Sequence, residues 1–456
     1  MKMEDLPVFE VLQEQTGKKI TFIHPPVGQY ELRFKLMLAS GKLPDIISHD
    51  FLNDYPGGMS GAVDDGIVLP LDGELLREAL NLRAFLEENP EAAADIQLPD
   101  GSYACFPSCN ADEGTSTYMG PFIRRDLLKK HGLEMPETLE DWEEVLSSFQ
   151  ADPAIDTPLT FYGGNIVDTR FMIGTFGIDW SFLFRDGKII YGPAEPAFIN
   201  FVKCFRSWYQ NGWMDPGVLI NSRRAYIKAV EQNTAGIYVD YVSNILTYER
   251  LLQKKNPEAE LLPLAYPRFD ETAPVPPGHD SGRFIPFASA YITTAADDPA
   301  AIARTLDYIW SPEGRRLFNF GIQGESYNLT NDKPTFLSAI FEKEGIGGYK
   351  YYLVAGPYLK DREAFMQSLR LPVQKEAVRL WAAGLTEENR RSFLPMTGGE
   401  KGARLMDLKS TLDSYAFETA VDVISGKAGD DRLEKLREDL QDLGLAEALE
   451  LCKVPD

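Results

Sequence analysis

A repeated order of helix, glycine and strand constrains the fold more than any other feature of this sequence. An amphipathic helical pattern that includes Val8 ends at Gly17, and the alternating stretch KKITFIHPP predicts a strand after it. A second helix is predicted over residues 29–40 and ends at Gly41, and the apolar run Asp45–Ser48 predicts a further strand. The buried face of the second helix is expected to consist of Tyr30, Phe34, Met37 and Leu38. This order is typical of parallel βαβ winding and indicates the α/β class.

Two of the expected strands run directly into hydrogen-bonding residues. One ends in Ser48, His49 and Asp50, and the other, the apolar run GIYV, ends in Asp240 and Tyr241. In open α/β sheets, ligands bind outside the carboxyl ends of the strands, which makes these residues candidates for ligand contact. A polar turn that leads into a surface helix explains the first group equally well, and both interpretations stay open.

Two tryptophans are predicted to be core residues. Thr138 and Asp141 have the spacing of a capping box, and the helix that they begin carries an apolar stripe that includes Trp142. Residues 198–213 carry a similar stripe that includes Trp208. A stripe at helical spacing packs against a core, so neither indole is expected to bind a ligand. The final part of the chain is predicted to be helical and strongly charged.

The charge balance argues against two classes of partner. The 456 residues include 46 basic and 69 acidic side chains, for a net charge of −23. Such a chain repels phosphate backbones and anionic lipid surfaces, so no nucleic acid is expected as a partner. No apolar run approaches the ~18 residues of a membrane span. The length allows two or three domains, and an apolar content of 44% can fill their cores.

The sequence contains no recognisable metal, cofactor or nucleophile motif. Cys105 and Cys109 lack a second pair at zinc-site spacing, their separation suits a disulfide poorly, and the four histidines form no HExxH. The patterns GxxxxGK[ST] and GxGxxG are absent, and GMSGA at residues 58–62 lacks the last glycine of a serine elbow. We therefore expect neither a cofactor nor a metal. The cysteines do not fix the redox compartment.

Aromatic residues are abundant, with 26 Phe, 20 Tyr and 6 Trp. Sugars bind by stacking their apolar faces on aromatic rings, in concave sites that often lie at domain interfaces. Most of these rings must belong to the core, because each buries a large apolar area. The pattern favours a binding protein, although among 69 acidic residues a catalytic carboxylate pair stays an open alternative.

Several stretches together resemble one protein family over nearly the whole chain. They are EVLQEQTGKKITFIHPPVGQYELRFKLMLASGKLPDII, FIRRDLLKKHGLEMPETLEDWEEVL, DGKIIYG followed by WYQNGWMDP, WSPEGRRLFNFGIQGESYN, and DLKSTLDSYAFETAVDVISG. They resemble the extracellular solute-binding proteins of family 1, and within it the lipoproteins that serve sugar ABC importers of Gram-positive bacteria. The spacing TG…ASG-x-LPDI and the WSPEGRRLFN…GESY block are specific in combination.

The resemblance implies a two-lobed clamp like that of type II periplasmic binding proteins, with a helical C-terminus. Each lobe would be a mostly parallel sheet flanked by helices. The first lobe would comprise residues 1–118 plus about 287–345, and the second residues 119–286 plus about 346–456. A carbohydrate would bind between the lobes, and hinge closure would be stabilised by contacts from both.

The resemblance also implies a set of ligand contacts. Ser48, His49 and Asp50 would face the ligand from the first lobe, and Asp240 and Tyr241 from the second. Arg170 and Arg283 are further candidates, and they either hold a carboxylate on the ligand or form ordinary surface ion pairs. Trp180, in a loop of the second lobe, and Tyr327, near the hinge, complete the set.

The implied function is that of an extracellular receptor and not of an enzyme. It would bind a mono- to short oligosaccharide, act as a monomer and deliver the sugar to the permease subunits of an ABC importer. Two alternatives stay open: a hydrolase or lyase that acts on glycans, which needs a positioned acid/base pair, and a ligand-sensing module for a sensor kinase.

The start of the sequence departs from the family pattern. The family begins with a lipobox cysteine and a β-strand, whereas MKMEDLPVFEVL has neither, and it contains no signal peptide. We expect a shortened or misassigned start, and an extracellular protein held at the cell membrane by a lipid anchor that is absent from this sequence. The missing strand would leave two strands of the first lobe without a shared partner.

Overall fold

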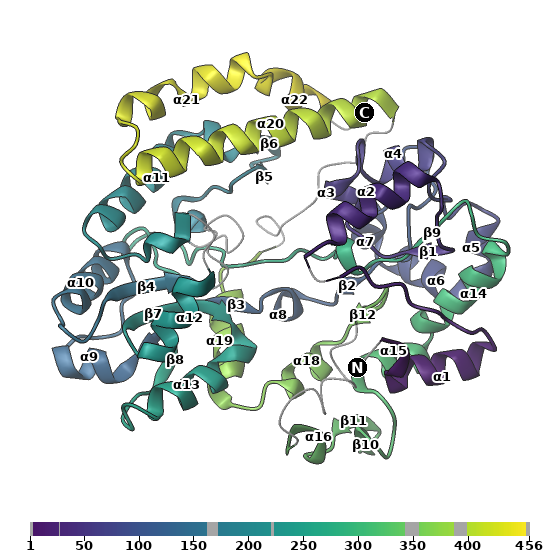
Figure 1. Ribbon diagram of the computed structural model, residues 1–456, viewed down its shortest axis with the longest axis horizontal. Coiled ribbons are helices and arrows are strands. Elements are labelled where there is room, and N and C mark those ends of the chain that lie inside the picture. The colour runs from purple at the N-terminus through teal and green to yellow at the C-terminus, as the bar shows by residue number, and fades with distance from the viewer. Residues whose placement is uncertain are drawn as a thin grey trace.

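Two large hydrophobic cores and one small core organise the molecule. The computed structural model describes residues 3–26, 28–161, 172–219, 223–342, 355–386 and 399–452. The first core lies at the right of Figure 1 and the second at the left, and a few chain segments cross between them. The small core lies below the crossing.

Helices make up most of the first core. They are α1 (Pro7–Thr16), α2 (Tyr30–Ser40), α3 (Phe51–Asp54), α4 (Gly58–Asp64), α5 (Leu75–Glu78), α6 (Leu80–Glu88), α7 (Pro90–Ala94), α14 (Pro299–Trp310) and α15 (Pro312–Phe320). Its described strands are short. β1 (Ile46–Ile47) pairs antiparallel with β9 (Tyr291–Ile292), and β2 (Cys109–Asn110) pairs in parallel with β12 (Leu359–Lys360). Cys105 and Cys109 are buried here as free thiols.

The expected strand KKITFIHPP does not form, and the structure corrects this prediction. Residues 17–26 have no regular structure, and the ring of Phe22 packs edge-on against Phe9 with 4.7 Å between the ring centres. A strand needs a neighbour with free backbone groups, and β1 is paired with β9 instead. The face of α2 is also less buried than expected, since Phe34 is buried whereas Tyr30 is 57% exposed.

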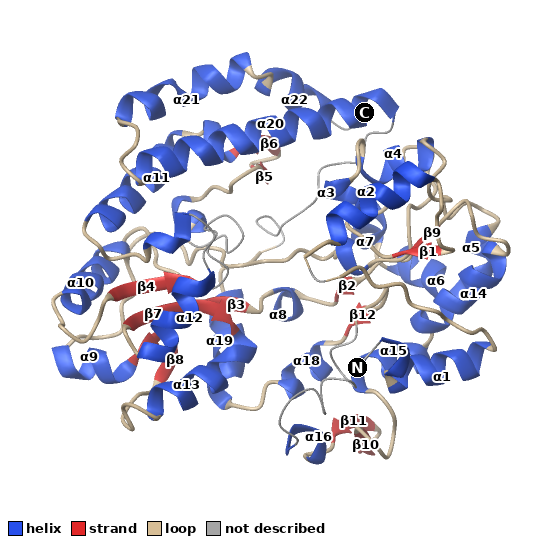
Figure 2. Cartoon of the chain, viewed as in Figure 1, coloured by secondary structure: helices blue, strands red, loops and turns tan. Residues whose placement is uncertain are grey.

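A four-stranded mixed sheet lies within the second core (Figure 2). Its order is β4 (Thr157–Phe161), β7 (Ala235–Tyr241), β3 (Met119–Arg124) and β8 (Leu261–Pro263). β4 and β7 are parallel, whereas β3 is antiparallel to both of its neighbours. The sheet is therefore less parallel than expected, because β3 leads the chain away from the crossing while β7 and β8 lead it back. A separate hairpin is formed by β5 (Phe182–Arg185) and β6 (Lys188–Tyr191).

Helices surround this sheet, and their apolar stripes build the second core. They are α9 (Arg125–His131), α10 (Leu139–Gln150), α11 (Pro196–Gln210), α12 (Arg223–Gln232), α13 (Ile245–Gln253) and α19 (Pro372–Ala382). The predicted capping box is confirmed: Thr138 accepts from the Asp141 amide, and Asp141 accepts from the Thr138 amide. The two tryptophans are confirmed as core residues, since Trp142 and Trp208 are fully buried and their parallel rings are 6.3 Å apart.

The C-terminal helices join the second core and reach the first. α20 (Gly399–Ile424), α21 (Asp430–Asp442) and α22 (Leu445–Leu451) pack together at the top of Figure 1. α20 contacts α11 of the second core and α4 of the first, so it spans both. In the part of the chain that the structure describes, no helix has the length and apolarity needed to cross a membrane.

A hairpin and two helices form the small core. β10 (Tyr327–Thr330) pairs with β11 (Lys333–Phe336), and α16 (Ala339–Glu342) and α18 (Arg362–Ser368) lie beside them. Phe320, at the end of α15, packs against Phe336 with 5.2 Å between ring centres. This unit follows the first core in sequence but buries its own apolar residues.

Asp152 is a buried carboxylate that ties the end of α9 to the turn after α10. Its Oδ2 accepts hydrogen bonds from Lys130 Nζ at 2.6 Å and from His131 Nε2 at 2.9 Å, and its side chain is 1% exposed. Burial opposes ionisation, but the hydrogen bonds outweigh it and lower the pKa of Asp152 from 3.8 to about 2.

We expect Asp152→Asn to lower the free energy of unfolding by about 2 kcal/mol at neutral pH, since one pKa unit corresponds to ~1.4 kcal/mol. A depressed carboxylate pKa contributes stability above about pH 4 that is lost as the pH falls towards 2. The difference between wild type and variant should therefore shrink over this range in urea titrations followed by tryptophan fluorescence. The exposed control Asp156→Asn should show no such trend. A difference that stays constant down to pH 2 would contradict this assignment.

Candidate functional site

Three chain segments cross between the two large cores and lie side by side. We define the crossing as residues 109–118, 279–285 and 358–361. The Asn110 amide donates to the Arg283 carbonyl at 2.8 Å, and the Cys109 amide donates to the Tyr358 carbonyl at 3.0 Å. The Ser281 amide donates to the Ser116 carbonyl at 3.1 Å. These bonds fix which residues of each core lie next to the crossing.

On the side of the first core, Ser48, His49 and Asp50 follow β1, and each has a local partner. Ser48 is exposed and its Oγ donates to the Phe287 carbonyl at 3.2 Å. Asp50 caps α3, because its carboxylate accepts from the backbone amide of Asn53 at 3.0 Å and from its side-chain amide at 2.8 Å. Asp50 remains half-buried, so part of it is accessible.

His49 is held by stacking and by a carboxylate. Its ring lies on the Phe34 ring with 3.7 Å between centres, and its Nε2 is 3.0 Å from Asp54 Oδ2. Burial lowers the pKa of His49, and the nearby carboxylates of Asp54 and Asp50 only partly offset this effect. The imidazole is therefore neutral at neutral pH and can both donate and accept one hydrogen bond.

On the side of the second core, Asp240 and Tyr241 at the end of β7 have different positions. Asp240 is 1% exposed and accepts from Tyr226 Oη at 2.5 Å and from Asn244 Nδ2 at 2.9 Å. Burial raises the pKa of Asp240, and its hydrogen bonds oppose that rise. Asp240 therefore anchors the end of the strand, while the half-buried Tyr241 lies beside the crossing.

Tyr241 belongs to a small aromatic group that the sequence analysis did not identify. Its ring is nearly parallel to that of Tyr118, with 5.7 Å between centres and 8° between planes. The ring of His279 lies 4.8 Å from that of Tyr118. Tyr118 and His279 come from crossing segments that are far from Tyr241 in sequence. Their grouping with Tyr241 is therefore visible only in the folded structure.

A second missed residue is Phe287, which is 63% exposed. It lies in a 3-10 turn, Pro286–Ala288, next to Ser48. The apolar stretch FIPFASAYIT, residues 284–293, predicts a continuous strand, but only Tyr291–Ile292 within it is one. Pro286 was the signal against that interpretation, because proline interrupts a strand and here turns the following side chain outward.

The remaining predicted site residues lie elsewhere. Trp180 is 6% exposed and packs edge-on against Phe198 and Phe201, so it is a core residue. Tyr327 is 4% exposed and packs on Phe320 in the small core. In both cases apolar neighbours bury the ring, and we do not keep these residues in the candidate site.

Among the described residues, the two predicted arginines do not form a site for a ligand carboxylate. Arg283 forms an ion pair with Glu91 of α7 at 2.5 Å, and this is the ordinary pairing that the sequence analysis left open. Arg170 lies outside the described residues. Within the described ranges, no three His, Cys, Asp or Glu side chains are grouped so that they could hold a metal ion.

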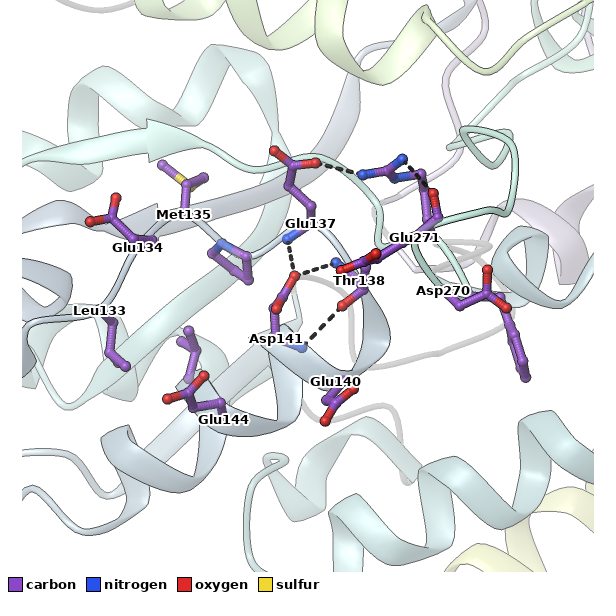
Figure 3. Close-up of a pocket in the computed structure, with 14 residues that line it drawn as sticks. Leu133, Glu134, Met135, Glu137, Thr138, Glu140, Asp141, Glu144, Asp270 and Glu271 are labelled. Carbon is purple, nitrogen blue, oxygen red and sulfur yellow. Dashed lines mark hydrogen bonds and ion pairs between the residues drawn. The ribbon is translucent and has the colours of Figure 1, made fainter.

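A surface pocket on the second core is strongly acidic (Figure 3). Its carboxylates are Glu134, Glu137, Glu140, Asp141, Glu144, Asp270 and Glu271. Asp141 is occupied by the capping box, and Glu137 pairs with Arg268 at 2.6 Å. No residue of the crossing lines this pocket. Two of its carboxylates thus stabilise the start of α10 and the adjacent loop, and we do not assign ligand binding to this pocket.

The sequence profile described as bacterial extracellular solute-binding protein matches residues 5–316. The chain belongs to this family. The solute-binding proteins similar to it include the fructooligosaccharide ABC transporter substrate-binding protein FusA of Streptococcus pneumoniae serotype 4, which is 28% identical over 256 residues. That alignment covers 53% of this chain and 47% of FusA. Lipoprotein LipO of Bacillus subtilis is 22% identical over 94% of this chain and 88% of LipO.

A solved structure confirms the fold. The alginate-binding protein AlgQ2 superposes with a TM-score of 0.82 at 22% identity, over 98% of this chain and 93% of AlgQ2. The predicted family and its two-lobed α/β fold are therefore confirmed. Among these relatives, both FusA and AlgQ2 are binding proteins by name.

We expect Asp50→Ala to have two separable effects. Loss of the helix cap should lower the free energy of unfolding by about 1 kcal/mol. If Asp50 also accepts a hydrogen bond from the solute, affinity should fall roughly tenfold. Asp50→Asn keeps a capping side chain and so isolates the second effect. Calorimetric titration and thermal unfolding measure the two quantities. Normal binding in both variants with early unfolding of Asp50→Ala would make this residue a structural turn only.

Proposed function

We propose that this solute-binding protein is an extracellular receptor for a mono- to short oligosaccharide, which binds between its two large cores. One observation carries the proposal: accessible aromatic and hydrogen-bonding groups flank the crossing from both cores. The first core supplies exposed Phe287 beside Ser48 and Asp50, and the second supplies the stacked pair Tyr118 and Tyr241. Rings of this kind stack on the apolar faces of sugars.

The polar groups beside these rings suit hydroxyl recognition. Asp50 accepts hydrogen bonds, and neutral His49, whose Nε2 faces the Asp54 carboxylate, can accept one at Nδ1. Several weak bonds of this kind fix the orientation of a sugar whose apolar faces provide the contact area. The similar protein FusA is named as the substrate-binding protein of a fructooligosaccharide ABC transporter, and this likeness supports the same class of ligand.

We propose that the two large cores belong to the lobes of a clamp, with the division that we expect at residues 118 and about 286. The crossing is the natural hinge, because it is where few segments join the two cores. We further propose that the receptor acts as a monomer, is held at the cell membrane by a lipid anchor, and delivers its sugar to ABC permease subunits.

We propose that the protein is not an enzyme. A glycan hydrolase or lyase needs an acid/base pair at the ligand, with carboxyl groups about 5–9.5 Å apart in hydrolases. Asp240 has a raised pKa, but it is buried and occupied by hydrogen bonds from Tyr226 and Asn244. Release of products from an oligosaccharide library, sensitive to one carboxylate substitution, would overturn this part of the proposal. A sensor role differs by its partner, and a kinase that binds the loaded protein would support it.

A thermal-shift screen of sugars, amino acids and peptides tests the ligand class. We expect only mono- to short oligosaccharides to raise the Tm, because a ligand that binds the folded state stabilises it by RT ln(1 + [L]/Kd), about 2.7 kcal/mol at 100-fold excess over Kd. Stabilisation by peptides or amino acids alone would show that the sugar class is wrong.

Phe287→Ala tests the exposed ring. We expect sugar affinity to fall about tenfold, since an aromatic stacking contact contributes ~0.5–1.5 kcal/mol beyond its buried area. The Tm of the sugar-free protein should not change, because the ring is 63% exposed. Phe184→Ala is the matched control, since Phe184 is 51% exposed on the β5–β6 hairpin. Calorimetric titration should show a loss for Phe287→Ala only, and equal affinities of the two variants would remove Phe287 from the site.

A further inference from the structure

A lysine in the crossing points away from the first core. Lys360 is in β12, where it pairs in register with Asn110 of β2. The preceding pair, Leu359 and Cys109, packs into the first core. Because successive side chains of a strand point to opposite faces, Asn110 and Lys360 point to the other side, towards the crossing segment 279–285. The Asn110 side-chain amide confirms this direction by donating to the Gly282 carbonyl at 2.7 Å.

The ammonium group of Lys360 has no hydrogen bond or ion pair with any other residue that the structure describes, although the side chain is half-buried. Other cations near the crossing do have partners. Arg283 pairs with Glu91, Arg362 pairs with Asp112 at 2.9 Å, and the guanidinium of Arg315 lies over the rings of Phe85 and Trp310. Removing an ammonium group from water without a counter-ion is costly. A chain with 69 acidic residues could readily have supplied one.

An unsatisfied acceptor lies on the same face. Asn110 is 1% exposed, and its Oδ1 has no hydrogen-bond partner among the described residues. Buried polar atoms are nearly always paired, so an unpaired donor and an unpaired acceptor at paired strand positions indicate a missing polar ligand. A group that satisfies both must carry a negative charge for Lys360 and a hydrogen-bond donor, such as a hydroxyl, for Asn110 Oδ1.

We propose that Lys360 binds a carboxylate of the ligand, and that the ligand is therefore an oligosaccharide that contains a uronic acid. Asn110 Oδ1 accepts a hydrogen bond from a hydroxyl of the same sugar. This inference rests on the proposed carbohydrate-binding function and narrows it to acidic sugars. It also moves the predicted charge recognition from Arg283, which is already paired, to a residue that the sequence analysis did not single out.

The electrostatic surroundings of Lys360 support this role. The charged or titratable groups on the elements around it are Cys109 of β2, the Asp112–Arg362 pair, Asp361, Glu313, Arg315 and Arg316 of α15, and His279, Asp280 and Arg283 of the crossing. None of them offsets its burial, which lowers the pKa of Lys360 to about 8. Asp361 instead caps α18 through the Ala364 amide. The ammonium form predominates at pH 7 and is lost as the pH rises through 8.

Calorimetric titration with oligogalacturonates of two to four residues, and with the methyl esters of the same oligosaccharides, tests the proposal. The ester keeps the hydroxyls and the shape but removes the charge. We expect the acid to bind wild type at least tenfold more tightly than the ester, and Lys360→Gln to abolish this preference. Lys360→Arg should keep it, and the exposed control Lys435→Gln should behave like wild type. The Tm of each variant shows that it is folded.

The pH dependence separates Lys360 from a permanently charged group. Between pH 7 and pH 9 the protonated fraction of a group with a pKa of about 8 falls roughly tenfold. The Kd of wild type for the acid should rise by a similar factor, whereas that of Lys360→Arg should stay flat, since arginine remains charged. Equal binding of acid and ester by wild type, or retained preference in Lys360→Gln, would overturn this inference.

Neutral sugars distinguish the proposed carbohydrate-binding function from the proposed acidic ligand. If neutral oligosaccharides bind but oligogalacturonates and oligomannuronates do not, the carbohydrate function stands and the acidic ligand is wrong. If no saccharide of either kind binds, both proposals fail.

Discussion

The backbone hydrogen bonds of the crossing join the two cores from which the assigned ligand-binding residues come. They join residues 109–118 to residues 279–285 and 358–361, segments that are far apart in sequence. Through them Lys360 meets Asn110. Tyr118 meets Tyr241 through the adjoining β3–β7 pairing, and Phe287 meets Ser48 beside the β1–β9 pair. None of these pairs is local, so the site exists only when both cores are folded. The hinge that we propose here consists of a few chain segments, so it can bend while the cores on either side keep their packing.

The aromatic residues fall into two populations with different roles. Most are buried and fill the cores, as with Trp142, Trp208 and Trp180. A few stay accessible beside the crossing, above all Phe287. A single exposed aromatic ring is common on protein surfaces, although exposing it to water has a free-energy cost. Phe287 differs because it lies next to the Ser48 hydroxyl and the Asp50 carboxylate, at the boundary between the cores, and such a position suits a sugar. Burial, more than residue type, separates the two populations.

Local patterns could be predicted from the sequence, and non-local pairings could not. The capping box of Thr138 and Asp141 and the burial of Trp142 follow from residue spacing within one helix. The prediction of a strand at KKITFIHPP was wrong, because alternation of apolar and polar residues does not supply the hydrogen-bonded neighbour that a strand needs. The buried Asp240 carboxylate accepts a hydrogen bond from Tyr226, a residue of another element, and no spacing in the sequence predicts that contact.

The same distinction applies to charge. A net charge of −23 argues against polyanionic partners at long range, and taken alone it disfavours any acidic ligand. Exposed charges more than about 8–10 Å apart are largely screened at physiological salt, so the bulk acidity has little influence at the crossing. There, Arg283 and Arg362 are neutralised by Glu91 and Asp112, whereas the half-buried Lys360 is not. A partly desolvated cation interacts more strongly than an exposed one, because the local dielectric is lower. In our proposal, the sign of the charge that the ligand carries is therefore set by a few groups at the crossing and not by the composition of the chain.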